Sequence, residues 1–238
     1  MQIDFIPIDY DYFDWQGRNY MTIIGRDDKG KRVCILDSFE PYFWAVLKQG
    51  VPEKNAKELQ RKIEKIKIES PGRTTKVEKT ELCKKKFLGK AVQAIKVFIT
   101  NYKDAHAVAD KMGFPEIEAR REYDISLITR YIIEKKLIPL SWYRISGEIS
   151  DDFGISNLDA DLCIRAEKIE KIEDKQFSPK IMAYDIEADA VGIGMGEILM
   201  ISLFSEKFKR VLTWKKSPAK LDYVEYCKDE ADMLEKFA

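Results

Sequence analysis

The chain has 238 residues, which is enough for one large domain or two ordinary ones. Hydrophobic residues make up 45% of it and charged residues 34%, as in globular proteins with a charged surface. The 41 basic and 41 acidic side chains give a net charge of zero, which argues against a protein that binds polyanions through its overall charge. The four cysteines and the single histidine lack metal-ligand spacing, so we expect neither a zinc site nor a disulfide framework. The sequence shows neither a signal peptide nor an apolar run of about 18 residues, so we expect a cytoplasmic protein without a membrane partner.

The first 52 residues favour strands. Residues 20–24 and 32–36 are apolar runs on either side of the turn-forming residues 27–30, which is the pattern of a β-hairpin. Residues 41–47 form a further, aromatic-rich strand, which the Gly-Val-Pro segment at 50–52 ends.

Residues 53–119 alternate between helix and strand patterns. Apolar spacing predicts an amphipathic helix over 53–66, and Asn101 suits the cap of a short helix that ends at Gly113. The order β-α-β-β-α-β is that of a ferredoxin-like unit, which often binds nucleic acid through its sheet. Residues 97–100 lack the aromatic signature of RNA-recognition modules, so the fold alone assigns no such role. We expect the strands of this unit at 41–47, 74–84, 92–100 and from Ile117 onward.

Basic residues are concentrated in the first part of the chain. Residues 1–140 contain 27 basic and 21 acidic side chains, whereas residues 141–238 contain 14 and 20. Within the first part, residues 61–90 hold 11 basic residues against 4 acidic ones. This segment is either a solvated helix face followed by a strand or a surface that faces phosphates, and the sequence favours neither interpretation.

A domain boundary is expected between about residues 140 and 177. Residues 124–136 predict a helix, and Gly147 and residues 151–154 suggest loops before a short strand at 162–165. We therefore assign residues 1–140 to an N-terminal domain, 141–176 to a connector with some strand, and 177–238 to a second domain.

The second domain begins with strands. Residues 181–187, 197–204 and 210–214 predict strands with short connections, which are naturally antiparallel neighbours, and a helix begins at Asp229. The glycines at 192, 194 and 196 lie between strands rather than before a helix, so they do not indicate a phosphate-binding loop.

Asp185 and Glu187, on the first of these strands, are the candidate catalytic residues. Side chains two residues apart on a strand share one face, about 6.5–7 Å apart along the strand. Such a pair suits two divalent metals about 3.5–4 Å apart for phosphodiester cleavage. A two-metal nuclease needs further carboxylates from later strands, and 51 residues follow Glu187, so we expect the front part of an enzyme.

Several stretches together resemble the N-terminal end of an archaeal family B DNA polymerase. The stretch at 182–187, Met-Ala-Tyr-Asp-Ile-Glu, is similar to the first motif of the family's 3′→5′ proofreading exonuclease. The resemblance implies an α+β fold: a β-rich N-terminal domain with a ferredoxin-like βαββαβ unit (1–140), followed by the first strands of an RNase H-like exonuclease domain, truncated here at 177–238. The similar stretches, in the family's order, are 39–45, 86–90, 122–125, 130–131 with 137–139, and 182–187.

The resemblance also implies a function, that of a DNA-directed DNA polymerase with a proofreading exonuclease in DNA replication. Asp185 and Glu187 would bind the catalytic divalent ions, Mg²⁺ or Mn²⁺. The later exonuclease motifs and the polymerase domains would lie beyond residue 238. We therefore expect the chain alone to bind metal weakly or not at all and to be inactive. Its partners would be DNA, as template single strand and primer terminus, and a complementary C-terminal polymerase chain.

Archaeal members of the family read uracil in the template, and the resemblance places their pocket in the N-terminal domain. A flipped base needs a snug apolar slot and hydrogen bonds to its pairing edge. Ala94 stands where the family usually has a β-branched residue and Leu127 where an aromatic is common, so the pocket would be looser and could admit the methyl group of thymine. The pocket positions are Tyr12, Pro41, Tyr42, Ala94, Ile125 and Leu127, with Arg130 nearby.

Two other functions remain open. The chain could be a stand-alone DNA-binding module that reads single strands or uracil. It could also be a minimal metal nuclease, although Asp185 and Glu187 are an incomplete ligand set for one.

Overall fold

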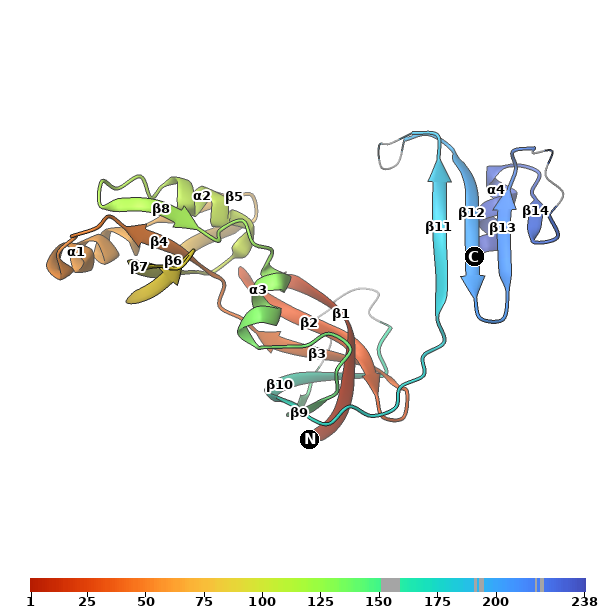
Figure 1. The fold of residues 1–238 in the computed structure, drawn as a ribbon, viewed down its shortest axis with the longest axis horizontal. Coiled ribbons are helices and arrows are strands. Elements are labelled where there is room, and N and C mark those ends of the chain that lie inside the picture. Colours follow the sequence, from red (N-terminus) through yellow and green to blue (C-terminus); the bar gives the residue numbers. More distant parts are fainter. Residues whose placement is uncertain (151–158, 191, 193–194, 217, 219–220) are drawn as a thin grey trace. The chain divides into compact units, whose positions relative to one another are not determined.

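A computed structural model of the chain describes residues 1–150, 159–190, 192, 195–216, 218 and 221–238 (Figure 1). The chain divides into two compact units, Met1–Lys175 and Gln176–Ala238, and each is described by itself. Residues 151–154, expected in loops, and Gly194 of the glycine-rich segment lie outside the described residues.

A closed five-stranded barrel forms part of the first unit (Figure 1). Strands β1, β2 and β3 pair antiparallel in succession, and β9 pairs antiparallel with β1. Strand β10 closes the barrel because it pairs antiparallel with β9 and parallel with β3. Five-stranded Greek-key barrels of this kind include the oligonucleotide-binding folds. The strands are β1 (Gln2–Trp15), β2 (Arg18–Asp27), β3 (Arg32–Ser38), β9 (Tyr143–Ile149) and β10 (Leu162–Lys171).

Both closing strands come from the range 141–176, which the sequence pattern assigned to a connector. Gly147 lies inside β9, and a Cβ atom at this position would be 2.1 Å from the carbonyl oxygen of Arg165 on β10. The glycine therefore permits a close approach of two strands and does not mark a loop. The β9–β10 register shifts next to this contact, between Ala166 and Lys168.

A second sheet is inserted between β3 and β9, and its fold is the ferredoxin-like unit predicted from the sequence. The elements β4-α1-β6-β7-α2-β8 follow the order β-α-β-β-α-β, and the sheet order is β5-β6-β7-β4-β8 with all neighbours antiparallel. The Asn101 side chain accepts a hydrogen bond from the Lys103 amide and begins the short helix η1, as expected. The elements are β4 (Tyr42–Leu47), α1 (Glu53–Ile63), β5 (Lys67–Ser70), β6 (Arg73–Phe87), β7 (Lys90–Ile99), η1 (Tyr102–Asp104), α2 (Ala105–Asp110) and β8 (Ile117–Arg121).

The two faces of this sheet differ because side chains alternate along each strand. Phe43 and Ala45 of β4 are fully buried in a core with Leu59 and Ile63 of α1 and with residues of α2. Tyr42 and Trp44, which point to the other face, belong to a separate aromatic cluster. The helices α1 and α2 thus cover one face, and aromatic side chains occupy the other.

Helix α3 (Leu127–Glu134) follows the inserted sheet and packs on the barrel. Ser126 caps it, because its side chain accepts a hydrogen bond from the Thr129 amide at 3.2 Å. Leu127 and Tyr131 enter the barrel core, and the Tyr131 hydroxyl donates to Asp37 Oδ2 at 2.8 Å.

The second unit is a four-stranded sheet with one helix. Strands β11, β12 and β13 are antiparallel neighbours, as the sequence predicts, and β14 pairs parallel with β13. Met233 of α4 is buried with Ile201, Leu203 and Leu212 of the sheet. None of the helices in the described parts of the chain is long and apolar enough to cross a membrane. The elements are β11 (Met182–Ala188), β12 (Ile198–Ser205), β13 (Lys209–Thr213), β14 (Val224–Tyr226) and α4 (Glu230–Phe237).

Candidate functional sites

Asp185 and Glu187 lie on β11, which pairs only with β12 among the described strands. Asp185 is opposite Ser202 and Glu187 is opposite Met200. Strand alternation places both carboxylates on one face of the sheet. Tyr184 points to the other face, where its ring centroid is 6.0 Å from that of Phe237 on α4. The carboxylates therefore face away from α4.

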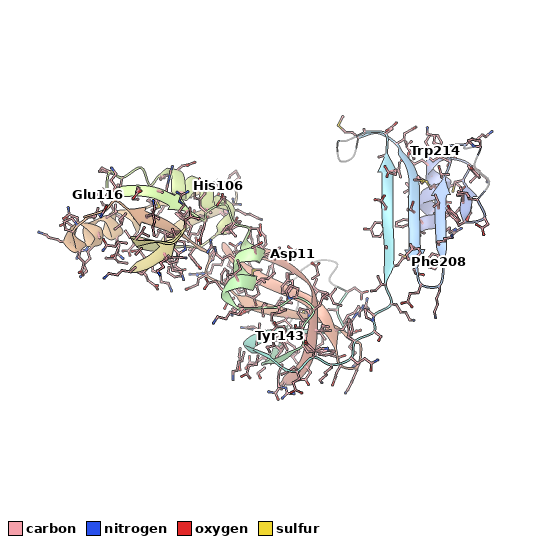
Figure 2. The ribbon with its side chains drawn as sticks, viewed as in Figure 1. Asp11, His106, Glu116, Tyr143, Phe208 and Trp214 are labelled. Carbon is pink, nitrogen blue, oxygen red and sulfur yellow. The ribbon has the colours of Figure 1, made fainter. Side chains whose placement is uncertain are left out.

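The face that carries the carboxylates is open to solvent. Every residue of β11 is exposed, and an open hollow of about 350 Å³ lies beside Asp185. Phe208, at the turn between β12 and β13, is also exposed (Figure 2). A ligand could thus reach the carboxylates directly. The residues that line the hollow include Asp185, Ser202, Phe204, Lys209 and Tyr223.

The donor set at this face fits part of a divalent metal site. Carboxylate oxygens are the ligands that Mg²⁺ and Mn²⁺ prefer, and Mg²⁺ in enzymes is often held by one or two carboxylates plus water. In the described parts of the chain, no group of three or more histidine, cysteine or acidic residues is placed to hold a metal ion. Asp185 and Glu187 therefore offer carboxylate oxygens of the kind that such an ion prefers, and the described residues place no third histidine, cysteine or acidic side chain with them.

Asp189 continues the two-residue spacing of acids, but its carboxylate closes the turn after β11. Its Oδ1 accepts a hydrogen bond from the Glu197 amide at 2.8 Å. Gly196 in the same turn has φ +82°, and a Cβ atom there would lie 2.2 Å from Asp189 Oδ1.

The single histidine, His106, lies on α2 with its ring centroid 4.9 Å from that of Tyr123 (Figure 2).

The positions expected to form a uracil pocket fall into separate surroundings. Tyr42 and Ala94 are buried in the aromatic cluster, and the Arg130 guanidinium carbon lies 4.4 Å from the Tyr42 ring centroid. Leu127 belongs to the barrel core, and the partly buried Tyr12 packs against that core. Pro41 lines a different hollow, of about 310 Å³, and the Ile125 carbonyl accepts a hydrogen bond from Tyr102. The structure thus brings Tyr42, Ala94 and Arg130 together.

Two glutamates that sequence reasoning missed hold Tyr42 and Arg130 in place. Arg130 is 5% exposed and donates from Nη2 to the Glu122 carbonyl at 2.9 Å and to Glu122 Oε2 at 3.1 Å. The Tyr42 hydroxyl donates to Glu134 Oε1. Burial, aided by this hydrogen bond and opposed by Arg130, raises the pKa of Tyr42 to about 12, so the phenol stays neutral. Glu134 lies four residues after Arg130 on α3, so the two side chains share one face of the helix. This spacing is the sequence signal that could have identified Glu134 as a neighbour of Arg130.

Comparison with known proteins agrees on one family. The family model for the exonuclease domain of DNA polymerase family B matches residues 118–238. The DNA polymerases of Thermococcus sp. (strain GE8) and Thermococcus gorgonarius are each 30% identical over 234 residues, which is 97% of this chain. The family B DNA polymerase from the hyperthermophilic archaeon Pyrobaculum calidifontis superposes with a TM-score of 0.66 at 20% identity, over 99% of this chain and 28% of that one. The chain spans 11% and 25% of the two Thermococcus proteins, and it corresponds to their N-terminal part.

Proposed function

The chain belongs to DNA polymerase family B, and from this premise we propose that it is the N-terminal part of a DNA-directed DNA polymerase with a 3′→5′ proofreading exonuclease that acts in DNA replication. One observation carries the proposal. Asp185 and Glu187 share the open face of β11, inside the range that the exonuclease-domain model matches.

In this proposal Asp185 and Glu187 hold the divalent ions of the exonuclease, Mg²⁺ or Mn²⁺. When bound, such ions activate water and stabilise the leaving 3′ oxygen. The residues of this chain orient the ions: the pairing of β11 with β12 fixes the backbone of Asp185 and Glu187, and the open face leaves room for a primer terminus. The chain matches only part of its relatives' length, so the proposal assigns any further ligands to the rest of the family's exonuclease domain.

The partners follow from the same proposal. The second unit, Gln176–Ala238, contains the domain that the sequence analysis assigned to residues 177–238, and it binds the primer terminus as the start of an exonuclease domain. The first unit contacts the template single strand. A complementary C-terminal chain supplies the polymerase domains.

Primer extension tests the proposal. The chain is mixed with a polymerase chain that contains the remaining domains of the family but lacks this N-terminal part. We expect extension of a primed template by the mixture and none by the 238-residue chain. A folded partner that binds the chain and still extends no primer would contradict the proposal.

A second candidate function is a stand-alone module that reads single strands or uracil. The observation that favours it is that Tyr42 and Ala94 lie together on one face of the ferredoxin-like sheet, with Arg130 of α3 over the Tyr42 ring. Affinity for single strands that contain uracil or thymine tests it. Tighter binding of the uracil strand supports a uracil reader, and equal affinities remove that role.

A further inference from the structure

The turn between β6 and β7 presents an exposed leucine in a strained backbone conformation. Leu88 and Gly89 form this two-residue loop, and their φ angles are +48° and +80°. Two positive φ angles are typical of a type I′ turn, which favours asparagine, aspartate or glycine at its first position. A leucine is sterically disfavoured there, and the Leu88 side chain is 100% exposed. Leu88 therefore strains the backbone and gains no packing in the fold that would offset the strain.

The hairpin of β1 and β2 has the same loop geometry with a polar residue at its tip. Gln16 and Gly17 form that loop, and their φ angles are +49° and +74°. The Gln16 side chain is exposed, so it interacts with water where Leu88 presents an apolar group. A turn of this geometry thus folds without an apolar side chain, which indicates that Leu88 serves something other than the turn.

Unpaired positive charge surrounds the leucine. Residues 84–93 contain four lysines and no acidic residue. Lys85 contacts the Trp44 ring, whose centroid is 3.8 Å from its Nζ. The other three lysines are exposed and form no ion pair with a carboxylate of the described residues, so their charges are available to a polyanion. These three are Lys84, Lys86 and Lys90.

Leu88 lies at the end of a two-stranded ribbon. The last pair between β4 and β7 joins Val46 to Ala94, whereas β6 and β7 continue to pair from Lys84 and Gln93 to the turn. Two-stranded ribbons fit into the grooves of duplex DNA. We call residues 84–93 the basic ribbon.

The lysines of the basic ribbon lie on both of its faces. Lys84 and Lys86 are two residues apart on β6, so they share one face. Lys90 pairs with Phe87, the next residue after Lys86, and therefore lies on the other face. Charge on both sides of an apolar tip suits a groove that is bordered by two phosphate backbones.

We propose that the basic ribbon binds duplex DNA and that Leu88 inserts between neighbouring base pairs from the minor groove. Lys84 and Lys86 contact the phosphates of one strand, and Lys90 contacts those of the other. Apolar side chains used as such wedges partly unstack a base step and kink the duplex. Pyrimidine–purine steps deform most easily, so the wedge acts preferentially at these steps.

This ligand goes beyond the proposed function, which assigns a template single strand and a primer terminus to the chain. The wedge rests on the proposed function only for DNA as the class of ligand. Duplex lies ahead of a polymerase wherever the template is still paired with another strand, and unstacking begins the separation of such pairs. The wedge also gives a role to part of the basic segment 61–90.

The variant L88N tests the wedge without weakening the fold. Asn-Gly is a preferred sequence for this turn, so L88N removes the apolar tip and relieves backbone strain. The ligand is a short duplex with 2-aminopurine after thymine at its central steps, because the fluorescence of this base rises when it is unstacked. Anisotropy of a second label measures affinity.

The original chain should raise the 2-aminopurine fluorescence of the duplex. L88N should abolish this rise and weaken duplex binding about ten-fold or more, without lowering the melting temperature of the chain. The matched control is Q16N, which makes the corresponding change at the tip of the β1–β2 hairpin. Q16N should alter neither the duplex affinity nor the fluorescence rise.

Three results would overturn the proposal. The first is an L88N chain that binds and unstacks the duplex as the original chain does. The second is an equal loss of affinity for the duplex and for a single strand of the same sequence, because a wedge needs stacked base pairs. The third is binding to phosphatidylserine vesicles that is as tight as duplex binding and is lost in L88N, because this would assign the tip to a lipid surface.

The salt dependence of duplex binding tests the lysines. Each phosphate contact contributes about 0.9 to the slope of log affinity against log salt, so K86Q with K90Q should lower the slope by about 1.8. The control K62Q with K65Q removes two exposed lysines at and just after the end of α1 and should leave the slope unchanged. Equal slopes for the two double variants would contradict the phosphate contacts.

Failure of the wedge can be distinguished from failure of the proposed function. Duplex binding and unstacking are measured on the 238-residue chain alone, whereas the proposed function is tested by primer extension with a complementary chain. A chain that supports extension but does not unstack the duplex would overturn the wedge and leave the proposed function in place.

Discussion

Replacing Asp104 by Asn is expected to destabilise the first unit by about 2 kcal/mol at neutral pH. The Asp104 side chain is 8% exposed, and both of its oxygens accept hydrogen bonds from Arg73 at 2.8 Å. Thr75 donates to Oδ2 at 2.6 Å and Ser70 donates to Oδ1 at 2.8 Å. The carboxylate therefore connects β5, β6 and the start of α2.

The magnitude follows from the pKa of Asp104. The Arg73 hydrogen bond is the largest of the causes that lower this pKa from 3.8 to about 2. At about 1.36 kcal/mol per pKa unit, this gap corresponds to roughly 2.4 kcal/mol of stability. Because the folded-state pKa is depressed, the contribution is complete above about pH 5 and is lost as the pH falls toward 2. Arg73 is 24% exposed and can be hydrated in the variant, so we add no penalty for a buried unpaired charge.

Urea unfolding followed by tryptophan fluorescence measures the effect, since Trp15, Trp44 and Trp142 all lie in the first unit. The control is E53Q, which removes the exposed partner of Lys57 on α1 and should leave the stability unchanged within the error of the measurement. A D104N variant within about 0.5 kcal/mol of the original at pH 7 would refute the reasoning. So would an equal stability difference at pH 7 and pH 2.

Further predictions concern the barrel core, the turn after β11 and the metal ligands. Y131F removes the hydroxyl that donates to the buried Asp37 and should cost about 1 to 2 kcal/mol in urea unfolding, whereas a neutral effect would mean that the hydrogen bond contributes little. G196A forces a side chain into a positive-φ turn against Asp189 and should lower the melting temperature of the second unit, seen through Trp214, but leave the first unit unchanged. Calorimetric titration of the 238-residue chain with Mg²⁺ should show millimolar or weaker binding that D185A abolishes, and tight binding would indicate a complete ligand set.

The local elements of the fold could be predicted from the sequence, because turn residues and periodic apolar positions encode them directly. The hairpin of β2 and β3, the helix α1 and the ferredoxin-like order of strands and helices all follow from such patterns. Closure of the barrel could not be predicted in this way. Strand β10 pairs in parallel with β3, although the whole inserted sheet separates the two strands in the sequence. The local sequence of β10 does not identify a pairing partner at this distance along the chain. Gly147 added to the difficulty, because the sequence does not distinguish a glycine that permits close contact between strands from a glycine that permits a turn.

The candidate sites were predictable to a similar extent. The two-residue spacing of Asp185 and Glu187 already indicates that they share one face of a strand. The sequence pattern did not predict how exposed that strand is, since exposure depends on what packs against β11. The aromatic cluster on the face of the ferredoxin-like sheet opposite α1 and α2 was missed because only 97–100 was searched for aromatic residues. That range holds one member, Phe98, whereas Tyr42 and Trp44 lie at alternate positions of β4.

The central claim is that Asp185 and Glu187 are metal ligands of a proofreading exonuclease to which this chain contributes the first strands. The most direct measurement is Mg²⁺-dependent removal of the 3′ nucleotide from a labelled primer by the chain together with a chain that supplies the remaining family domains. Because a metal-bound transition state is stabilised by several kcal/mol, D185A should reduce the rate by about 100-fold or more. The control E206Q, which changes an exposed acid at the turn between β12 and β13, should retain the full rate. Equal rates for D185A and E206Q would contradict the account.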